Sequence, residues 1–416
     1  MLVFYSLALL LVLVLGAPYW LFRMATSGKH REGLSERLGF VPRRLRIPDS
    51  VIWVHAVSVG EVLAAGRLIE ELGALSGCTV MISTTTRTGQ RLARERFGAD
   101  HVFYFPLDFA FAVRSWLRAL RPRMVVLLET EFWPRMLIEC RRAGVPVAVV
   151  NARISDRSWP RYLRLHFLWR RLLNGLALAL AQSELDVERL RALGAGNVRV
   201  GGNLKYDIRV AQPAAVTDTL QAHLPKDVRV IVCGSTLAGE EDLLADAVPP
   251  DVVTILAPRH PERFDAVAAM LTDRGLPFVR RSQWMASPTP LTAGAFFLLD
   301  SIGELASVYS LASVAVVGGG FFAPGGHNPL EPAQFGVPVV IGPHYENFRG
   351  IVEKLRMENA VAIVGPSALP EELRDRLSNR EAAQAMGARG RAVFEREAGA
   401  TERAVTALVA LLRERA

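Results

Sequence analysis

Short apolar runs alternate with amphipathic segments along most of this chain. In the first half the apolar runs, many of them β-branched, are 51–57, 79–84, 101–105, 123–129, 145–150, 177–182 and 197–201. Between them, apolar residues recur at helical spacing in 61–75, 87–97, 109–120 and 184–193. Strands that alternate with helices form βαβ units, so the pattern predicts an α/β fold with a parallel sheet.

The alternation weakens once, where small and polar residues collect between 202 and 226, and then starts again. The later apolar runs are 228–234, 251–257, 277–280, 296–299, 313–317, 337–341 and 361–364, followed by a helical stretch at 380–415. We therefore expect two Rossmann-like domains, at 23–207 and at 227–416 with its C-terminal helix, joined by a linker at 208–226. Ligands bind such sheets at the carboxyl ends of the strands, so two domains facing each other would form a ligand-binding cleft.

The first 22 residues carry no charge and are almost all apolar. About 20 such residues in a helix reach across a ~30 Å hydrocarbon layer, so 1–22 predicts a single transmembrane anchor, with Tyr19 and Trp20 at the interface. A basic flank follows, and its members are Arg23, Lys29, Arg31, Arg37, Arg43, Arg44 and Arg46. This flank places the domains in the cytoplasm. A cleaved signal peptide fits less well, because its charge would precede the apolar run.

Net charge and cysteine usage narrow the possible partners only slightly. The 416 residues carry a formal net charge of +8, which suits nucleic acid, an anionic membrane surface or phosphorylated substrates. Cys78, Cys140 and Cys233 lie far apart without a CxxC pair, which argues against a zinc site or a disulfide framework. The chain contains no Asp-x-Asp pair, the commonest metal motif of sugar-nucleotide enzymes.

An acid stands where the first strand should give way to a helix. In "IWVHAVSVGEVLAAGRLIEEL", residues 52–72, Glu61 falls at the predicted helix N-terminus. The positive end of the helix dipole favours its ionised form, and a partly buried carboxylate beside a ligand site can act as a general base. Glu61 could equally do no more than neutralise the helix end.

Two further segments of the first half carry candidate chemistry. "VVLLETEFWPRML" ends a strand with Glu129 and Glu131, which either face a ligand or bond to a neighbouring loop. The segment 149–173 interleaves six arginines with Trp, Tyr, Phe and His side chains. Such a basic and aromatic segment can bind anionic lipid or phosphates, can bind nucleic acid, or can form a solvated face over a core.

In the second half, candidate phosphate-binding residues follow the predicted strands. Ser235 and Thr236 stand between a strand and a helix, and Arg259 and His260 follow the next strand. The densest segment is 315–348, in which five glycines surround one helix start. We expect its glycines to let a phosphate approach the backbone, and Glu331 to accept hydrogen bonds from a ribose. Alternatively, Asn328 and Glu331 form a capping box with Pro329 as the first helical residue.

Together these residues resemble the Kdo transferases, which move 3-deoxy-D-manno-oct-2-ulosonic acid (Kdo) from CMP-Kdo onto lipid A precursors. The matching motifs are "HAVSVGE" at 55–61, "STTTRTG" at 83–89, "PLD" at 106–108, "ETEFWP" at 129–134, "NARISDRS" at 151–158, "GGNLKYD" at 201–207, "APRHPER" at 257–263, "DSIGEL" at 300–305 and "GGHNPLEPA" at 325–333. The resemblance covers most of the chain and implies a two-domain GT-B glycosyltransferase. It implies an inverting reaction without a catalytic metal or cofactor, at the cytoplasmic face of a bacterial inner membrane.

Carried over residue by residue, the resemblance makes Glu61 the general base. The expected donor-binding residues are Ser235, Thr236, Arg259, His260, Gly303, Glu304, Gly319, Gly320, Gly326, Asn328 and Glu331. The implied partners are CMP-Kdo, a lipid A precursor (lipid IVA) and the inner-membrane surface, with no nucleic acid. Position 135 departs from the family, which often has Asn where this chain has Arg.

Two other functions compete with this interpretation. One is a GT-B transferase that uses a UDP-sugar to build another surface glycolipid. The other is a membrane-tethered, non-catalytic protein that binds anionic lipid through 153–171. The sequence leaves the number of Kdo residues added, the acyl pattern of the acceptor and the oligomeric state open.

Overall fold

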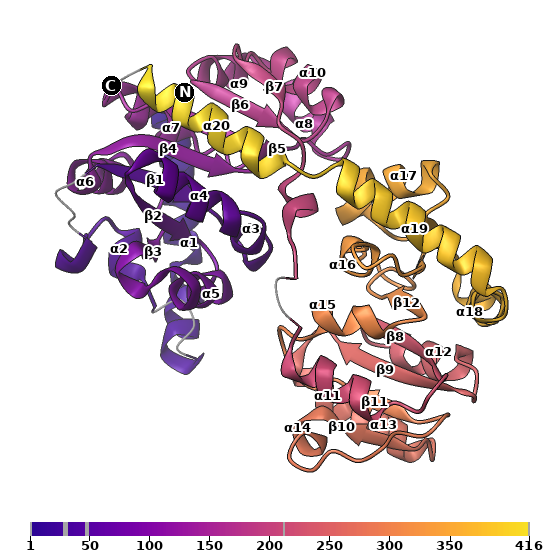
Figure 1. The fold of residues 1–416 in the computed structure, drawn as a ribbon. Coiled ribbons are helices and arrows are strands. Elements are labelled where there is room, and N and C mark those ends of the chain that lie inside the picture. Colours follow the sequence, from indigo (N-terminus) through magenta and orange to yellow (C-terminus); the bar gives the residue numbers. More distant parts are fainter. Residues whose placement is uncertain (1, 28–31, 46–49, 211–212, 415–416) are drawn as a thin grey trace. The chain divides into compact units, whose positions relative to one another are not determined.

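The computed structural model describes residues 2–27, 32–45, 50–210 and 213–414, and it contains two compact α/β units (Figure 1). The first unit combines Met1–Ile208 with Ala398–Ala416, and the second is Arg209–Glu397. Lys29, Arg31 and Arg46 of the predicted basic flank lie outside the described residues.

A seven-stranded parallel sheet in the order β3-β2-β1-β4-β5-β6-β7 forms the centre of the first unit. Its strands are β1 (Val51–His55), β2 (Thr79–Thr84), β3 (Val102–Tyr104), β4 (Pro122–Leu128), β5 (Val147–Ala152), β6 (Leu178–Ala181) and β7 (Val198–Val200). The strand order reverses between β1 and β4, which is where open parallel sheets bind ligands. Glu61 follows β1 and Glu129 follows β4, so the topology brings these two acids to one edge of the sheet.

Helices cover both faces of this first sheet. α3 (Val59–Ala64), α4 (Gly66–Ser76), α5 (Arg87–Phe97) and α20 (Ala400–Arg413) contribute apolar side chains to one core. α6 (Ala110–Leu120), α7 (Pro134–Arg142), α9 (His166–Leu173) and α10 (Glu184–Ala192) contribute to the other. Strand β1 serves both cores by alternation, because Trp53 points into one and Ile52 and Val54 point into the other.

The second unit repeats the architecture with a parallel sheet in the order β10-β11-β9-β8-β12-β13-β14. Its strands are β8 (Arg229–Thr236), β9 (Val252–Pro258), β10 (Phe278–Arg280), β11 (Phe296–Leu298), β12 (Val314–Val317), β13 (Val339–Ile341) and β14 (Val361–Ile363). The order reverses between β8 and β12. Ser235 lies at the end of β8 and Gly318 directly follows β12, so the predicted donor loops meet at this reversal.

The helices of the second unit also lie on both faces of their sheet. α11 (Ala215–His223), α14 (Arg281–Trp284), α15 (Leu305–Val308), α16 (Leu330–Ala333) and α17 (Arg349–Met357) pack into one core. α12 (Glu240–Ala247), α13 (Phe264–Asp273) and α18 (Leu369–Ser378) pack into the other. Because Val216 and Leu220 of α11 are fully buried there, most of the interval expected as a linker belongs to the second unit.

The predicted C-terminal helix is divided between the two units. α19 (Arg380–Arg396) contacts α16, α17 and α18, and the chain then turns at Gly399, whose φ of 91° suits glycine. The carboxylate of Asp207 accepts hydrogen bonds from the N–H groups of Gly399 (2.6 Å) and Thr401 (2.5 Å), and α20 packs against α4. We expected a second domain that runs to residue 416, whereas this contact places α20 in the first unit.

The N-terminal residues form α1 (Leu2–Ser27), with α2 (Leu34–Arg37) after it. The Tyr5 hydroxyl donates to Asp108 Oδ2 at 2.8 Å, and Nε of Arg135 donates to the Ser6 hydroxyl at 2.9 Å. Within the described ranges, no helix combines the length and the apolar character needed to cross a membrane. The expected transmembrane anchor at 1–22 is therefore not supported.

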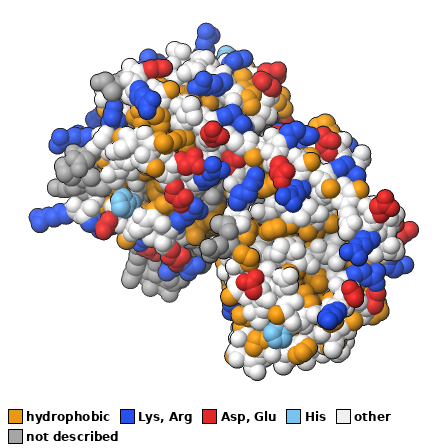
Figure 2. Space-filling model, in the orientation of Figure 1, with side chains coloured by type: hydrophobic (Ala, Val, Ile, Leu, Met, Phe, Trp, Pro, Cys, Tyr) orange, Lys and Arg blue, Asp and Glu red, His pale blue; other side chains and the backbone are white. Residues whose placement is uncertain are grey.

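Basic and acidic side chains are mixed on the surface. On the face shown in Figure 2, Lys and Arg side chains are interspersed with Asp and Glu. Many of the described ion pairs are short-range pairs on exposed helices, such as Arg67–Glu71 and Arg391–Glu395. Exposed pairs of this kind contribute about 0.2–1 kcal/mol each. On this face the basic side chains lie among acidic ones and do not form one basic surface.

Candidate active site

Glu61 lies between β1 and α3, at the reversal of the first sheet. It is the third residue of α3, which begins after Ser58. Glu61 Oε2 accepts a hydrogen bond from the Val57 N–H at 2.8 Å, and Oε1 accepts one from the Ser58 hydroxyl at 2.9 Å. The carboxylate therefore accepts hydrogen bonds from two donors at the helix start, in addition to lying at the positive end of the helix dipole. Each oxygen keeps a second lone pair, so capping leaves Glu61 able to accept a proton.

The surroundings of Glu61 make it an unusually weak acid for a carboxyl group, whereas its place at a helix N-terminus was expected to favour the ionised form. The side chain is half-buried, and burial is the main reason that its pKa rises from 4.5 to about 7. The hydrogen bonds from Val57 and Ser58 oppose the rise, whereas the negative charges of Glu129 and Glu131 add to it. A group that titrates near neutral pH suits general base catalysis, because both of its protonation states are accessible.

Glu129 and Glu131 follow β4, the neighbouring strand. Glu129 has a φ of 54°, a left-handed conformation that is uncommon outside glycine, and its N–H donates to the Val150 carbonyl at 2.9 Å. Such positions cost about 1–3 kcal/mol and are concentrated at functional sites. Burial raises the pKa of Glu131, and the charge of Glu129 raises it further. The structure thus gathers three carboxyl groups at one edge of the first sheet.

The loop between β2 and α5 holds the Glu61 loop in place. The N–H groups of Thr85 and Thr86 donate to the Val57 carbonyl at 3.2 and 3.1 Å. Gly89 allows the close approach of α5, because a Cβ atom there would lie 3.2 Å from the carbonyl carbon of Ser58. The sequence predicts no function for the residues of this segment beyond their place in the family motif at 83–89. Their role depends on strand pairing, which the local sequence does not encode.

The basic and aromatic segment 149–173 has two different sides. It forms α8 (Trp159–Arg164) and α9, and the rings of Tyr162 and Trp169 contact Phe132 in the loop that carries Glu131. These two rings are partly buried and pack against the core of the first unit. The exposed side instead combines apolar and basic residues, which are Leu163, Leu165, Phe167, Arg161, Arg164, Arg170 and Arg171.

Ser235 and Thr236 lie at the end of β8 in the second unit. Ser235 is one of the described non-glycine residues with positive φ, at 56°, and a register irregularity of the sheet falls there. The buried Thr236 hydroxyl donates to Glu241 Oε1 at 3.0 Å, and its carbonyl accepts the Arg259 N–H at 3.0 Å. Thr236 thus holds the loop together internally, while Ser235 is the less buried of the two.

A cluster of basic residues meets the start of α16. Arg259 and His260 follow β9 with exposed side chains. Burial lowers the pKa of His327 to about 4, and the charges of Arg259 and His260 lower it further. Burial raises the pKa of Glu331, which the charge of Arg259 partly opposes. Such charge effects require short distances. The side chains of Arg259 and His260, after β9, therefore lie close to those of His327 and Glu331, at the start of α16.

Asn328 caps the first turn of α16 in a modified form. Its Oδ1 accepts the Leu330 N–H at 3.2 Å, while its Nδ2 donates to Glu331 Oε1 at 3.5 Å. The helix begins at Leu330, so Pro329 precedes it and is not its first residue. Glu331 is therefore bonded to the Asn328 side chain, whereas a capping box would bond it to the backbone.

The glycine-rich loop differs from the expected phosphate cradle. The Gly319 N–H donates to Glu240, the Gly325 N–H donates to Glu346 at 2.8 Å, and the Gly326 N–H donates to the Gly319 carbonyl at 2.8 Å. A Cβ atom at Gly320 would lie 2.4 Å from the His344 carbonyl oxygen. The N–H groups of Gly319 and Gly326 are therefore not free to bind a phosphate, and the expectation that a phosphate approaches the backbone of this segment stays a prediction. These glycines permit close packing, and their N–H groups already have partners.

Gly303 and Glu304 are the expected donor residues with the weakest structural link to this cluster. The Glu304 carboxylate accepts hydrogen bonds from Arg281 (2.6 Å) and from the Ser301 hydroxyl. Gly303 is exposed, with a φ of 92° and open space around its Cα. Leu305, the residue after Glu304, contacts the end of β8, because a Cβ atom at Gly234 would lie 3.0 Å from the Cδ1 atom of Leu305. The loop is thus adjacent to the site, while its carboxylate binds α14.

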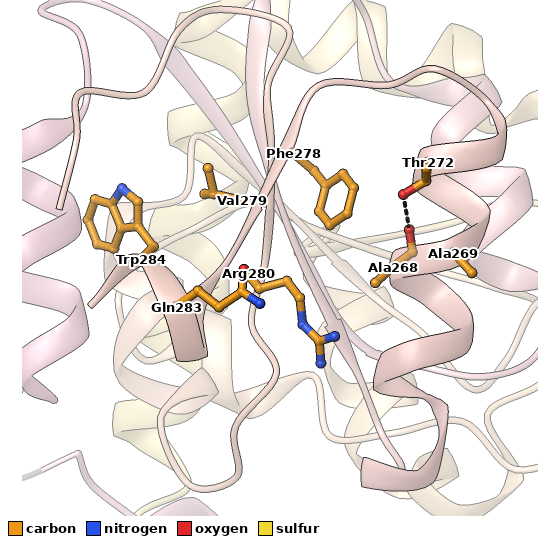
Figure 3. Close-up of a pocket in the computed structure, with 8 residues that line it drawn as sticks. All are labelled: Ala268, Ala269, Thr272, Phe278, Val279, Arg280, Gln283 and Trp284. Carbon is orange, nitrogen blue, oxygen red and sulfur yellow. Dashed lines mark hydrogen bonds between the residues drawn. The ribbon is translucent and has the colours of Figure 1, made fainter. Parts of the chain in front are cut away.

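A pocket of about 500 Å³ lies elsewhere in the second unit, beside the edge strand β10 (Figure 3). It is lined by Ala268, Ala269, Thr272, Phe278, Val279, Arg280, Gln283 and Trp284. The guanidinium group of Arg280 donates hydrogen bonds to Asp300 (2.9 Å) and to Asp265 (2.7 Å). None of the expected donor-binding residues lines this pocket, so it is separate from the candidate site. In the described part of the chain, no three His, Cys, Asp or Glu side chains are arranged to hold a metal ion.

Residues 32–208 match the family model "3-Deoxy-D-manno-octulosonic-acid transferase (kdotransferase)". The chain is 35% identical to the 3-deoxy-D-manno-octulosonic acid transferase of Bordetella pertussis over 94% of both chains. It is 32% identical to the enzyme of that name from Haemophilus influenzae over 91% of both.

Among solved structures, Acinetobacter baumannii MurG shares the fold, with a TM-score of 0.54 and 16% identity over 86% of this chain and 99% of that one. Its low identity makes it a guide to architecture alone, and it supports a GT-B-like assignment of the two parallel sheets. The identity to the named transferases extends over nearly the whole chain. This chain therefore belongs to the 3-deoxy-D-manno-octulosonic acid transferase family.

Proposed function

We propose that this chain transfers Kdo from CMP-Kdo to a hydroxyl group of a lipid A precursor, in the synthesis of the lipopolysaccharide core. The near full-length identity to named Kdo transferases is the observation that carries the proposal. The two candidate sites supply chemistry of the kind required, because one can accept a proton and the other offers cations to a phosphate.

In the proposed reaction Glu61 is the general base. The acceptor hydroxyl attacks the anomeric carbon of Kdo, and its proton passes to the Glu61 carboxylate. The bond from that carbon to the phosphate oxygen breaks, and CMP leaves from the opposite face with the bonding electron pair, so the anomeric configuration inverts. A pKa of about 7 leaves a substantial fraction of Glu61 ionised at neutral pH. The hydrogen bonds from Val57 and Ser58 fix the direction of its carboxylate.

The second unit binds the donor in this proposal. Arg259 offers exposed positive charge to the CMP phosphate, where negative charge grows as CMP leaves, and the exposed His260 offers a ring N–H donor. Ser235 presents its side chain from a strained turn at the end of β8. Asn328 and Glu331 are positioned at the start of α16 to bind the ribose or the base. The remaining candidates, Gly303 and Glu304, border this region.

We further propose that the enzyme works at the cytoplasmic surface of the inner membrane. Two described surfaces support this. Among the side chains of α1 that the structure describes, large apolar ones are exposed, namely Leu7, Leu10, Leu11, Val12, Val14, Leu15, Tyr19 and Phe22. On α8 and α9, Leu163, Leu165 and Phe167 are exposed among arginines, a combination that suits anionic lipid. The variant Leu163→Ser/Phe167→Ser should co-sediment less with phosphatidylglycerol vesicles than wild type, and equal co-sedimentation would show that vesicle binding does not need this surface and rests on α1.

The decisive experiment incubates purified protein with CMP-Kdo and a tetra-acyl lipid A precursor, followed by mass spectrometry of the lipid. We expect the lipid mass to increase by one or more Kdo residues, and we expect CMP to stabilise the protein against heat more than UDP does. Stabilisation by UDP alone would instead favour a UDP-sugar donor. Unmodified lipid beside an active reference transferase would refute the proposal.

A further inference from the structure

Glu240, at the start of α12, is a buried carboxylate without an assigned role. Only 1% of the residue is exposed. It forms no ion pair among the described residues, and its hydrogen-bond partners are backbone N–H groups. The Glu240 carboxylate accepts a hydrogen bond from each of three backbone N–H groups. The Gly319 N–H lies 2.9 and 2.7 Å from its two oxygens, and the N–H groups of Phe321 and Leu237 donate at 3.0 and 2.9 Å. Three amides from two loops therefore converge on one negative charge.

The Glu240 carboxylate occupies the position at which the N–H groups of the glycine-rich loop could otherwise bind an anion. Converging backbone N–H groups on a flexible, glycine-rich segment are the usual cradle for a phosphate. Here a side chain of the same unit occupies the cradle, so the donor phosphate has to be bound by other groups. Gly318 fits tightly against the carboxylate, because a Cβ atom there would lie 2.6 Å from Glu240 Oε2 and 2.8 Å from Thr236 Cα.

A chain of contacts leads from Glu240 to the donor-binding cluster. The Gly319 N–H is held by Glu240, and the Gly319 carbonyl accepts the Gly326 N–H at 2.8 Å. The imidazole ring of His327 lies directly against Gly319, since a Cβ atom there would be 2.3 Å from its Cδ2. His327 is close to Arg259 and immediately precedes Asn328. The position of these groups therefore depends on the conformation that Glu240 imposes on Gly319.

We infer that Glu240 is a positioning residue of the donor site, whose carboxylate takes the place of a ligand phosphate and fixes the glycine-rich loop in its binding conformation. This inference rests on the proposed function, because it assumes that the second unit binds CMP. Glu240 touches neither donor nor acceptor, and it acts through Gly319 and His327.

The test measures CMP affinity by calorimetry in the full-length protein carrying Glu240→Gln. The amide has about the same size, but it presents an NH₂ group where two N–H donors already converge. We expect CMP affinity to fall about tenfold or more, and the KM for CMP-Kdo to rise while kcat changes little. Val267→Ala, a core truncation in α13 that also lowers stability, should leave CMP affinity unchanged.

Gly318→Ala tests the same contact from the loop side and serves also if Glu240→Gln does not fold. Its added methyl group should displace the carboxylate and weaken CMP binding similarly. Gly350→Ala is its matched control, because that glycine has open space around it. Wild-type affinity in a folded Glu240→Gln or Gly318→Ala protein would overturn the inference. Failure of the wild-type protein to bind CMP would instead contradict the proposed donor, so the two failures are distinguishable.

Discussion

The two candidate sites respond to burial in opposite ways. In the first unit, burial and the charges of Glu129 and Glu131 raise the pKa of Glu61 to about 7. In the second unit, burial and the charges of Arg259 and His260 lower the pKa of His327 to about 4. In both sites the buried group is surrounded by charges of its own sign, which disfavours its ionised form.

The opposite pKa shifts of Glu61 and His327 suit the two sites to different tasks, proton transfer in the first unit and binding of a negatively charged phosphate in the second. Glu61 can change its protonation state near neutral pH, so the first unit is suited to accept the acceptor's proton. His327 stays neutral over that range, while the adjacent Arg259 stays positive, so the second unit offers a constant positive charge to a phosphate. Variants at the two sites should therefore affect different kinetic quantities.

The largest expected effect follows the loss of the base. Glu61→Gln keeps the shape and the acceptor for the Val57 N–H but cannot take up a proton. We expect kcat to fall by about 10²–10⁴-fold while CMP affinity stays within about twofold of wild type. Steady-state kinetics with a lipid acceptor and calorimetry with CMP measure the two quantities. Glu71→Gln, at an exposed ion pair on α4, is the matched control and should be fully active. Retained turnover in Glu61→Gln would rule out Glu61 as the base.

The next effect concerns the second site. Arg259→Met removes the permanent positive charge from the donor cluster, and we expect CMP affinity to fall about tenfold or more, the value of one charge-assisted hydrogen bond. Arg274→Gln serves as a control, since Arg274 pairs with Asp242 and Asp246 on the surface of the same unit. If CMP affinity is unchanged in Arg259→Met, the phosphate is bound elsewhere.

A smaller effect concerns stability. The pKa of Glu61 is higher in the folded protein than its ordinary value of 4.5, so ionised Glu61 destabilises the fold. This cost is absent below about pH 4.5 and complete above about pH 7. Glu61→Gln should therefore be more stable than wild type at pH 8, by about 1–2 kcal/mol after allowance for partial exposure. The two proteins should differ little at pH 4.5. Denaturant unfolding at both pH values tests this, and equal stability at pH 8 would contradict the raised pKa.

Sequence patterns predicted the strands well and the long-range contacts poorly. All the strands of the two sheets fall at the expected apolar runs, because strands covered on both faces are continuously apolar. The helix expected at 61–75 is broken near Ala65 into α3 and α4, and the stretch 380–415 is broken at Gly399. The return of α20 to the first unit depends on Asp207, a carboxylate remote in sequence from the amides it binds.

The same limit applies to the candidate site. Strand order alone brings Glu61 and Glu129 together, and the motif positions identified both. The glycines of 318–326 were also identified, but their partner Glu240 lies far away in sequence among the acids at the start of another helix. A local pattern shows where an amide can approach an anion. It does not show whether that anion is a ligand or a side chain of the same protein.

The smallest expected effect tests the carboxyl cluster of the first site. The negative charges of Glu129 and Glu131 raise the pKa of Glu61, and the effect of Glu129 is the larger. Replacing either with Gln should therefore lower the pKa of Glu61 and move the acid limb of the kcat profile to lower pH. We expect shifts of less than about one pH unit, larger for Glu129→Gln than for Glu131→Gln. Glu71→Gln again provides the control profile. An acid limb that stays in place in both variants would show that it reports a group other than Glu61, and proton transfer would then have to be assigned elsewhere.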